Sequence, residues 1–407
     1  MEKLTIEDLA DDEVRGRRVL LRVDYNVPLD DRQNVVDDTR IRSTVPTLQR
    51  LVGMGGRIVL LSHFGRPKGK RVSEMSLRPA ARRLAELLDR PVHFIGSTTG
   101  NEVVAATCDL QDGEVVLLEN TRFDPREEAN DPGMASDLAQ LGDLYVNDAF
   151  GAAHRAHAST AGVADAIRQR GGLAAAGLLM KRELDYLGSA LQDPKRPFIA
   201  ILGGAKISGK IDVIEALLPK TDHLLIGGAM ANTFFRAQGR QIGASLVEED
   251  RTELAKALLD RAGDKLVLPH DLVIARAMEA GSETRVVPID AIPAGWMALD
   301  IGPDTVVRYA EVVSSGKTVL WNGPMGVAEI PAFRHGTEGV ARALVSATSA
   351  GAVTIVGGGD SAAALLDLGL QDGVSHVSTG GGASLEFLEG RSLPGLDALS
   401  EPRRRPS

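Results

Sequence analysis

The 407-residue sequence predicts an α/β fold of two Rossmann-like domains, each a doubly wound parallel sheet, joined by a hinge helix. Three observations lead to this prediction. Continuous apolar runs of about four to six residues, without polar alternation, are typical of strands buried on both faces of a parallel sheet. Longer amphipathic stretches such as LRPAARRLAELLD lie between the runs, as expected of βαβ units. The chain also exceeds the roughly 250 to 300 residues that one hydrophobic core organises, so two domains are expected.

The predicted strands of the first half end in polar or charged side chains. Their runs are RRVLLRVDYN, GRIVLLSHFG, GEVVLLENTRF and DLYVNDAF. The polar residues at the ends of these runs are Asp24, Asn26, His63, Arg66, Asn120, Arg122, Asn147 and Asp148. Because ligands of open parallel sheets bind at the carboxyl ends of the strands, these side chains are expected to gather at one edge.

Basic residues of this half form the first candidate site in an otherwise acidic protein. The set consists of Arg40, His63, Arg66, Arg122 and Arg155. Any one of them alone could be an ordinary surface residue. Three of them, however, lie in predicted strand-end loops, and guanidinium groups bind carboxylates and phosphates through paired hydrogen bonds. The set therefore predicts a small polyanionic ligand.

A long helical pattern, LLMKRELDYLGSALQD, separates the two halves, and Pro194 and Pro197 end it. We expect an N-terminal domain over residues 1–178 and a C-terminal domain over residues 179–388, in which residues 179–195 form the connecting helix.

The predicted strands of the second half are followed mainly by glycine. Their runs are PFIAILGGAK, DHLLIGGAM, KLVLPHD, KTVLWNGPMG, AVTIVGGGD and SHVSTGGG. Glycine turns that lead from a strand into a helix let the main chain approach a phosphate group, with the helix N-terminal amides facing it. Two triple-glycine turns, VGGGDSAAAL and STGGGASLEFL, therefore predict a nucleotide site. Asp360 follows one of them, either as a magnesium ligand or as a helix N-cap.

The loop GAKISGK, which begins at Gly204, has the spacing of a phosphate-binding P-loop. Ile211, however, stands where that motif needs Ser or Thr for the magnesium ion. The pattern leaves two alternatives open, a chance match or another way of binding phosphate. The sequence HRAH at 154–157 lacks further ligands at metal-binding spacing, which disfavours a metal site, and the terminal RRRPS is interpreted as a solvated tail.

Composition excludes several classes of function. A net charge of −9 and an aromatic content of 4% argue against a nucleic-acid partner, which requires cationic surface and stacking platforms. Cys108 is the single cysteine, so internal disulfides are excluded and a reducing, cytoplasmic location is expected. The acidic N-terminus does not look like a signal peptide, and the longest mostly apolar run, at 171–180, is too short to span a bilayer.

Taken together, the motifs resemble those of phosphoglycerate kinases over nearly the full length of the chain. They are RVDYNVP, SHFGRP, LLENTRF and NDAFGAAHRAHAST in the first half, and ILGGAKISGK, WNGPMGVAE, GGGDSAAAL and STGGGASLEFLEG in the second. The resemblance implies that GAKISGK is not a P-loop, since magnesium would be held through Asp360 and Ile211 would be no defect. It also implies a monomer whose final segment, residues 389–407, returns to the first domain.

Roles for individual residues follow from the same resemblance. The residues expected to act in catalysis are Arg40, Lys206, Gly359 and Gly381. Those expected to bind the phosphoglycerate are Asp24, Tyr25, Asn26, Arg40, His63, Phe64, Gly65, Arg66, Arg122 and Arg155. Those expected to bind the nucleotide are Lys210, Gly302, Asn322, Glu329, Gly357, Gly358, Gly359, Asp360 and Ser361, and Asp360 is also expected to hold Mg²⁺. Ala152 and Ala328 depart from the family pattern, in which Thr and Phe are common, and Tyr25 and Phe64 are milder variations.

The implied reaction is glycolytic or gluconeogenic: reversible phosphoryl transfer from 1,3-bisphosphoglycerate to Mg-ADP, giving 3-phosphoglycerate and ATP. The acceptor carboxylate is already ionised at pH 7, so no general base is needed. In-line transfer would require domain closure about the connecting helix. The alternatives are a P-loop-like NTPase and a catalytically silent binding protein of the same fold. A dehydrogenase is disfavoured because no G-x-G-x-x-G follows the first strand.

Overall fold

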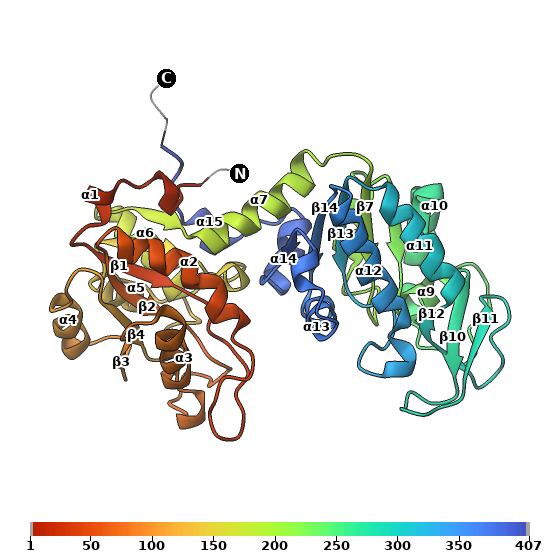
Figure 1. Ribbon diagram of the computed structural model, residues 1–407, viewed down its shortest axis with the longest axis horizontal. Helices are drawn as coiled ribbons and strands as arrows, with labels where there is room; N and C mark the ends of the chain where they lie inside the picture. Colours follow the sequence, from red (N-terminus) through yellow and green to blue (C-terminus); the bar gives the residue numbers. More distant parts are fainter. Residues whose placement is uncertain (1–2, 404–407) are drawn as a thin grey trace. The chain divides into compact units, whose positions relative to one another are not determined.

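The structure, a computed structural model, describes residues 3–403 and divides into two compact units (Figure 1). Unit 1 comprises the chain up to Asp185 together with the segment from Ser392 onward, and unit 2 is Tyr186–Arg391. The division falls inside helix α7 (Leu178–Gln192) rather than at its beginning, where the sequence analysis placed the boundary.

Unit 1 is built on a six-stranded sheet in which every neighbouring pair is parallel. The strands, in the order in which they lie across the sheet, are β3 (His93–Ile95), β4 (Val115–Leu118), β2 (Arg57–Leu61), β1 (Arg18–Arg22), β5 (Leu144–Asn147) and β6 (Ala174–Ala176). Its helices are α1 (Asp11–Val14), α2 (Thr39–Gly53), α3 (Arg78–Leu88), α4 (Asn101–Cys108), α5 (Pro132–Ala139), α6 (Val163–Gln169), the first part of α7, and α15 (Pro394–Asp397). Short 3₁₀ helices are η1 (Ile6–Asp8), η2 (Ser73–Met75), η3 (Thr121–Phe123) and η4 (Phe150–Ala152), and η5 (Ala158–Gly162) is a π-helical turn.

Unit 2 also contains a six-stranded parallel sheet, so the predicted fold class of two parallel-sheet α/β domains is confirmed. The strands, in the order in which they lie, are β15 (His376–Val377), β14 (Val353–Gly357), β13 (Thr318–Asn322), β7 (Phe198–Leu202), β8 (His223–Ile226) and β9 (Leu266–Val267). The helices are α8 (Ile211–Leu217), α9 (Met230–Ala237), α10 (Thr252–Ala262), α11 (Pro303–Ser315), α12 (His335–Ser349), α13 (Gly359–Asp367) and α14 (Gly382–Leu388), with 3₁₀ helices η6 (Glu249–Arg251), η7 (Gly263–Lys265), η8 (Pro331–Phe333) and η9 (Gln371–Gly373).

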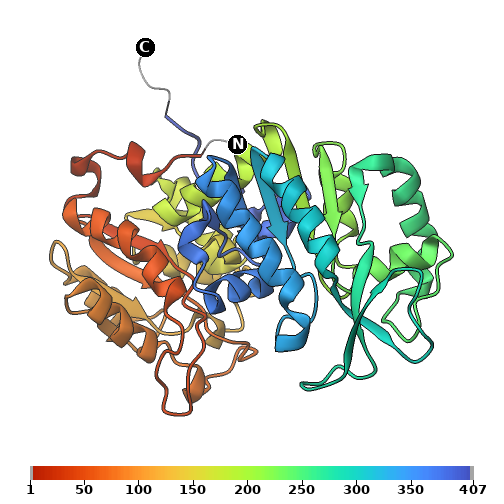
Figure 2. The same ribbon diagram turned by 45° about the vertical axis from the view of Figure 1, so that its right-hand side comes forward.

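A second, antiparallel sheet in unit 2 was not predicted from the sequence. It consists of β11 (Thr284–Pro288), β10 (Asp271–Ala275) and β12 (Met297–Ile301), in that order. Figure 2 shows β10 and β11 as a long teal-green hairpin. Most residues of β11 are exposed, so this strand lacks the continuous apolar run that identified the parallel strands.

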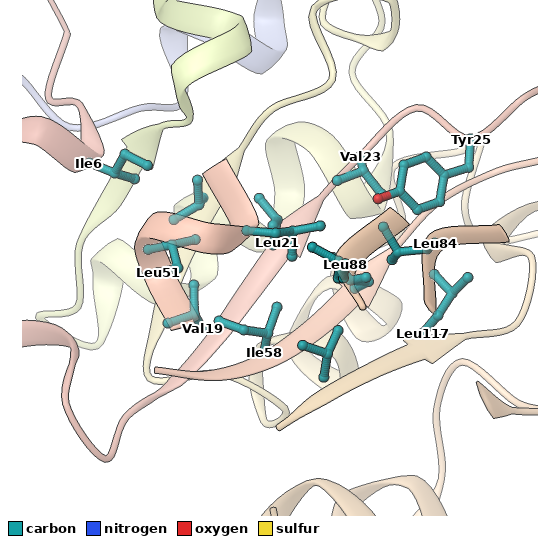
Figure 3. Close-up of a cluster of buried hydrophobic side chains, with 14 of the residues drawn as sticks. Ile6, Val19, Leu21, Val23, Tyr25, Leu51, Ile58, Leu84, Leu88 and Leu117 are labelled. Atoms are coloured by element: carbon teal, nitrogen blue, oxygen red, sulfur yellow. The ribbon is translucent and has the colours of Figure 1, made fainter. Parts of the chain in front are cut away.

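The core of unit 1 fixes the carboxyl ends of its central strands. Figure 3 shows Val19 and Leu21 of β1 packed with Leu51 of α2 and with Leu84 of α3, all of them buried. Helix α3 buries one face because its apolar residues recur at helical spacing, and it ends at Asp89, whose φ is +51°. The loops that follow the strands therefore start from rigid positions.

The segment from Ser392 onward completes the edge of the sheet in unit 1. Ser400 donates its amide to Ala174 O at 2.8 Å and accepts from the amide of Leu4 at 2.8 Å. Gly395 packs directly on Ala153, and its carbonyl accepts from Asn147 Nδ2 at 3.1 Å. Figures 1 and 2 both show the chain segments near the two termini side by side.

Candidate active site

Each parallel sheet has a point at which its strand order changes direction. In unit 1 the chain leaves β1 toward β2 and leaves β5 toward β6, and in unit 2 it leaves β7 toward β8 and β13 toward β14. Loops that diverge from two neighbouring strands leave a crevice at the carboxyl edge of the sheet. The two crevices therefore lie beside the loops after β1 and β5 and beside the loops after β7 and β13.

Asp24, in the loop after β1, is paired with a basic residue of the predicted site. Arg40 Nη1, from the first turn of α2, lies 2.7 Å from Asp24 Oδ2. Burial opposes ionisation of Asp24, but its interactions with His63 and with the positive charges of Arg40 and Arg22 hold the pKa of this carboxyl below its ordinary value. The carboxylate thus offsets part of the positive charge around it and orients Arg40.

His63, in the loop after β2, is a neutral member of the same cluster. Its Nδ1 lies 3.0 Å from Arg22 Nη2 and 3.9 Å from Asp24 Oδ1. Burial lowers the pKa of His63 well below its ordinary value, and the positive charges of Arg22, Arg122 and Arg40 act in the same direction, against the influence of Asp24. The ring is therefore uncharged at neutral pH and acts through hydrogen bonds.

Three side chains tie the loops after β1, β2 and β4 together. Asn26 Oδ1 accepts the amide of Gly65 at 2.9 Å, and Arg122 Nη1 donates to Gly65 O at 2.8 Å. Asn120 accepts the amide of Phe64 at 3.1 Å and donates to its carbonyl at 2.7 Å. A pocket of about 730 Å³ lies beside these loops, with Asn26, Phe64 and Gly65 in its wall. Four of the predicted site residues are thus brought together, with room for a ligand next to them.

The remaining predicted residues of unit 1 lie in different environments. Arg66 and Arg155 are exposed, and Arg155 is close enough to Arg122 to lower its pKa, an effect secondary to that of burial. The Tyr25 side chain is fully buried in the core (Figure 3), where its hydroxyl lies 2.9 Å from Thr44 Oγ1. This side chain therefore holds the loop and does not line the basic cluster. Ala152, which departs from the family pattern, is buried in η4.

In unit 2, Lys210 at the beginning of α8 interacts with predicted nucleotide-binding residues of β13 and α13. Its ammonium group donates to Asn322 Oδ1 at the end of β13. Burial lowers the pKa of Lys210 to about 8, while Asp360 in the first turn of α13 acts to raise it. Gly358, with φ at +87°, passes against the Asn322 amide group, where a Cβ atom would lie 3.3 Å from both Nδ2 and Oδ1. The structure thus brings together the predicted residues Lys210, Asn322, Gly358 and Asp360.

Several glycines of unit 2 lie where two loops are in close contact, and not at an open surface. A Cβ atom on Gly203 would lie 2.1 Å from Pro324 O, and one on Gly323 would lie 2.3 Å from Gly203 O. A Cβ atom on Gly228 would lie 2.5 Å from Gly204 O. These three glycines are required because two backbones cross at the crevice. By contrast, Cβ atoms on Gly359 and Gly381 would meet nothing within 4 Å.

The other predicted residues of unit 2 also fall into two groups, those packed between loops and those exposed to solvent. A Cβ atom on Gly302 would collide with the Asp271 carboxylate, and fully buried Ser361 accepts the amide of Gly323 at 2.7 Å. Gly357 is buried at the end of β14. Lys206 and Glu329 are exposed. The first group shapes the loops, and the exposed pair is available to a ligand. Within residues 3–403, no group of three or more His, Cys, Asp or Glu side chains could hold a metal ion.

Comparison with known proteins agrees with this arrangement. The sequence profile of the family described as phosphoglycerate kinase matches residues 6–391. The chain belongs to the phosphoglycerate kinase family. It is 54% identical to the phosphoglycerate kinase of Chlorobium limicola and 56% identical to that of Herpetosiphon aurantiacus, over 98% of this chain and 100% of each relative. It is therefore an enzyme, a phosphotransferase of glycolysis that binds ATP.

Solved phosphoglycerate kinase structures have the same fold. The enzyme from Coxiella burnetii matches with a TM-score of 0.87 at 40% identity, covering 97% of this chain and 98% of that one. The enzyme from Pyrococcus horikoshii matches with a TM-score of 0.83 at 31% identity and the same coverage. Within the described residues, no helix is long and apolar enough to cross a membrane.

Sequence reasoning missed three residues that underlie the basic cluster: Arg22, Glu127 and Ser159. Arg22 is the last residue of β1 and is fully buried, and so are Glu127 and Ser159. A charged residue inside the run RVLLRV was an available signal for Arg22. Glu127 gave no such signal, because most of its neighbours in the stretch DPREEAND are charged as well.

Proposed function

We propose that this chain catalyses reversible phosphoryl transfer from 1,3-bisphosphoglycerate to Mg-ADP, giving 3-phosphoglycerate and ATP, by in-line transfer without a covalent intermediate. The observation that carries the proposal is the excess of positive charge in unit 1. The positive charges of Arg22, Arg40 and Arg122 all act on His63, and Asp24 is the carboxylate that opposes them there. A ligand with several negative charges would complete this cluster.

On this proposal, catalysis needs charge neutralisation rather than a proton acceptor. The attacking atom in the ATP-consuming direction is a carboxylate oxygen, which is ionised at pH 7. Arg40 and Lys206 would neutralise the oxygens of the moving phosphoryl group. The backbone amides of Gly359 and Gly381, at the beginnings of α13 and α14, would donate hydrogen bonds to the same group.

The nucleotide would be held by residues of unit 2. Lys210 and Asn322 lie in contact and, with Gly357, Gly358 and Asp360, would surround its phosphates. Exposed Glu329 would contact the ribose, while Gly302 and Ser361 keep the neighbouring loops in place.

Mg²⁺ fits the exposed Asp360 carboxylate, because this ion is usually held by one or two carboxylates together with substrate phosphates. When bound there, the ion would neutralise charge on the phosphates. A dedicated cage of several protein ligands is not needed for this role.

The proposal is tested by ATP-dependent phosphorylation of 3-phosphoglycerate with magnesium, followed through a coupled NADH assay. We expect turnover that requires both substrates. Turnover of ATP without 3-phosphoglycerate would instead support a P-loop-like NTPase, and nucleotide binding without any turnover would indicate a catalytically silent protein.

We also propose that α7 acts as a hinge, since the acid is expected to bind residues of unit 1 and the nucleotide residues of unit 2. Small-angle scattering should show a smaller radius of gyration with both substrates bound than with either one. An unchanged radius would contradict the hinge.

A cytoplasmic location and a monomeric state stay predictions. Light scattering after size-exclusion chromatography tests the monomeric state.

A further inference from the structure

Arg22 adds to the positive charge of the cluster, but its side chain is fully buried and the proposed reaction assigns it no contact with a substrate. Its guanidinium makes three hydrogen bonds: Nε to Ser159 Oγ at 2.9 Å, Nη1 to the carbonyl of Val23, and Nη2 to His63 Nδ1 at 3.0 Å. A guanidinium group can only donate hydrogen bonds. The direction of all three bonds is therefore fixed.

Glu127 anchors the other end of this chain of bonds. Ser159 Oγ, which accepts from Arg22, donates its own proton to Glu127 Oε1 at 2.5 Å. The Ser159 amide donates to Glu127 Oε2 at 2.9 Å, and Thr121 Oγ1 donates to Oε1 at 3.1 Å. Glu127 thus accepts from three donors in the interior, and Ser159 connects it to Arg22.

Two neighbours of His63 favour opposite states of its ring. Asp24 Oδ1, 3.9 Å from Nδ1, would favour a proton on that nitrogen. Arg22 Nη2, at 3.0 Å from the same atom, requires that Nδ1 accept. The shorter contact comes from a group that cannot lose its proton, so Arg22 decides the outcome. Burial and the positive charges of Arg22, Arg122 and Arg40 also lower the pKa of His63, which agrees with a neutral ring.

We propose that the buried chain from Glu127 through Ser159 to Arg22 is a positioning device that holds His63 as the neutral tautomer with its proton on Nε2. Nε2–H is then available to donate a hydrogen bond to the anionic groups of the phosphoglycerate. The His63 ring neither gains nor loses a proton during the reaction. This last step rests on the proposed function. Arg22, Ser159 and Glu127 are positioning residues, because they act through His63.

The tautomer can be read directly in the full-length chain labelled with ¹⁵N-histidine. Long-range ¹H–¹⁵N NMR spectra at pH 7 distinguish the two neutral tautomers from each other and from the charged ring. The His63 signals are assigned by their loss in His63→Gln. We expect native His63 to show one neutral tautomer with an unprotonated Nδ1.

Matched variants test each link of the chain. Ser159→Ala should release Arg22 and give a mixture of tautomers, whereas Ser159→Thr, which keeps the hydroxyl, should restore the native pattern. Glu127→Gln should disturb the pattern. Glu128→Gln should leave it unchanged, because the exposed Glu128 contacts Arg122 (3.2 Å) and lies outside the chain. In the coupled assay, Ser159→Ala should raise the KM for 3-phosphoglycerate about tenfold and change kcat by less than about threefold.

Two results would overturn the proposal: a native His63 with its proton on Nδ1, or an unchanged tautomer in both Ser159→Ala and Glu127→Gln. If Ser159→Ala does not fold, the comparison of Glu127→Gln with Glu128→Gln decides the question. Failure of the proposed function is distinguishable, since the spectra are recorded without substrate and a lack of turnover would not alter them.

Discussion

In both units the candidate site lies at the carboxyl edge of a parallel sheet, where the strand order changes direction, but the two sites consist of different kinds of residue. In unit 1 the site consists of charged and polar side chains that already bond to one another, such as Arg40 with Asp24 and Arg22 with His63. In unit 2 it consists of glycine loops whose backbones cross, with Lys206 and Asp360 exposed beside them. The sheet topology therefore sets where a ligand binds, and the strand-end loops set what kind of ligand it is.

The largest effect should come from an exposed charge of unit 2. Lys206→Ala should lower kcat by about 10²- to 10³-fold, the usual cost of losing one donor to a developing charge, with little change in nucleotide affinity. Steady-state kinetics measures this. Lys256→Ala, which removes another exposed lysine of unit 2, is the matched control and should keep native turnover. A kcat within a few-fold of native in Lys206→Ala would remove this residue from the proposed mechanism.

A charge of unit 1 that is already paired should behave differently. Arg40→Ala should lower kcat/KM for 3-phosphoglycerate about 10²-fold, because it removes a donor to the ligand and leaves Asp24 without its ion-pair partner. Asp24→Asn in the Arg40→Ala background should recover part of the substrate affinity, since it removes a negative charge from the site. If the double variant binds no better than the single one, the two residues do not act as the pair that the structure shows.

Substitutions in the crossing loops of unit 2 should change the stability of the protein rather than the charge of the site. Gly203→Ala places a Cβ atom against Pro324 O, so it should lower the free energy of unfolding of unit 2 by about 2–3 kcal/mol. Urea denaturation followed by the fluorescence of Trp296 and Trp321, which both belong to unit 2, would measure it. Gly188→Ala in α7, where a Cβ atom meets nothing within 4 Å, should leave stability unchanged or slightly raised. Equal effects of the two substitutions would argue against the crossing.

The smallest effect concerns the charge of Lys210. Its pKa is lowered to about 8 by burial, so the free enzyme loses this positive charge as the pH rises through 8, and ATP should bind more weakly above that value. The decrease should reach at most tenfold per pH unit. Because the unfolded chain still binds this proton up to its ordinary pKa near 10.4, stability from this group rises with pH over the same window.

Calorimetric measurement of ATP binding between pH 7 and 9.5 would detect the change, and Lys210→Arg should flatten it, since arginine stays charged. A pH-independent affinity in the native chain would contradict a phosphate contact from Lys210.

Much of this architecture was predictable from local patterns, and the exceptions have physical causes. The parallel strands and their polar ends were visible because buried strands need unbroken apolar runs. The glycines after the strands of the second half were attributed to ligand approach, whereas Gly203 and Gly323 permit a backbone crossing that only the tertiary structure reveals. Arg22 and Glu127 were missed because a buried charge is recognised by its partners, which lie far away in sequence. The sheet containing β11 was missed because that strand is exposed.

The return of the chain to unit 1 has a consequence for biosynthesis. Unit 2 is a single continuous segment, Tyr186–Arg391, whereas unit 1 needs the residues from Ser392 onward, which bond to Leu4 and Ala174. On the ribosome, the first part of the chain to emerge therefore lacks the edge that covers its β6 strand until the segment from Ser392 onward has been synthesised. Unit 2 can complete its contacts earlier. Synthesis of unit 1 therefore begins first, but its folding can be completed only after unit 2 and the segment from Ser392 onward have been synthesised.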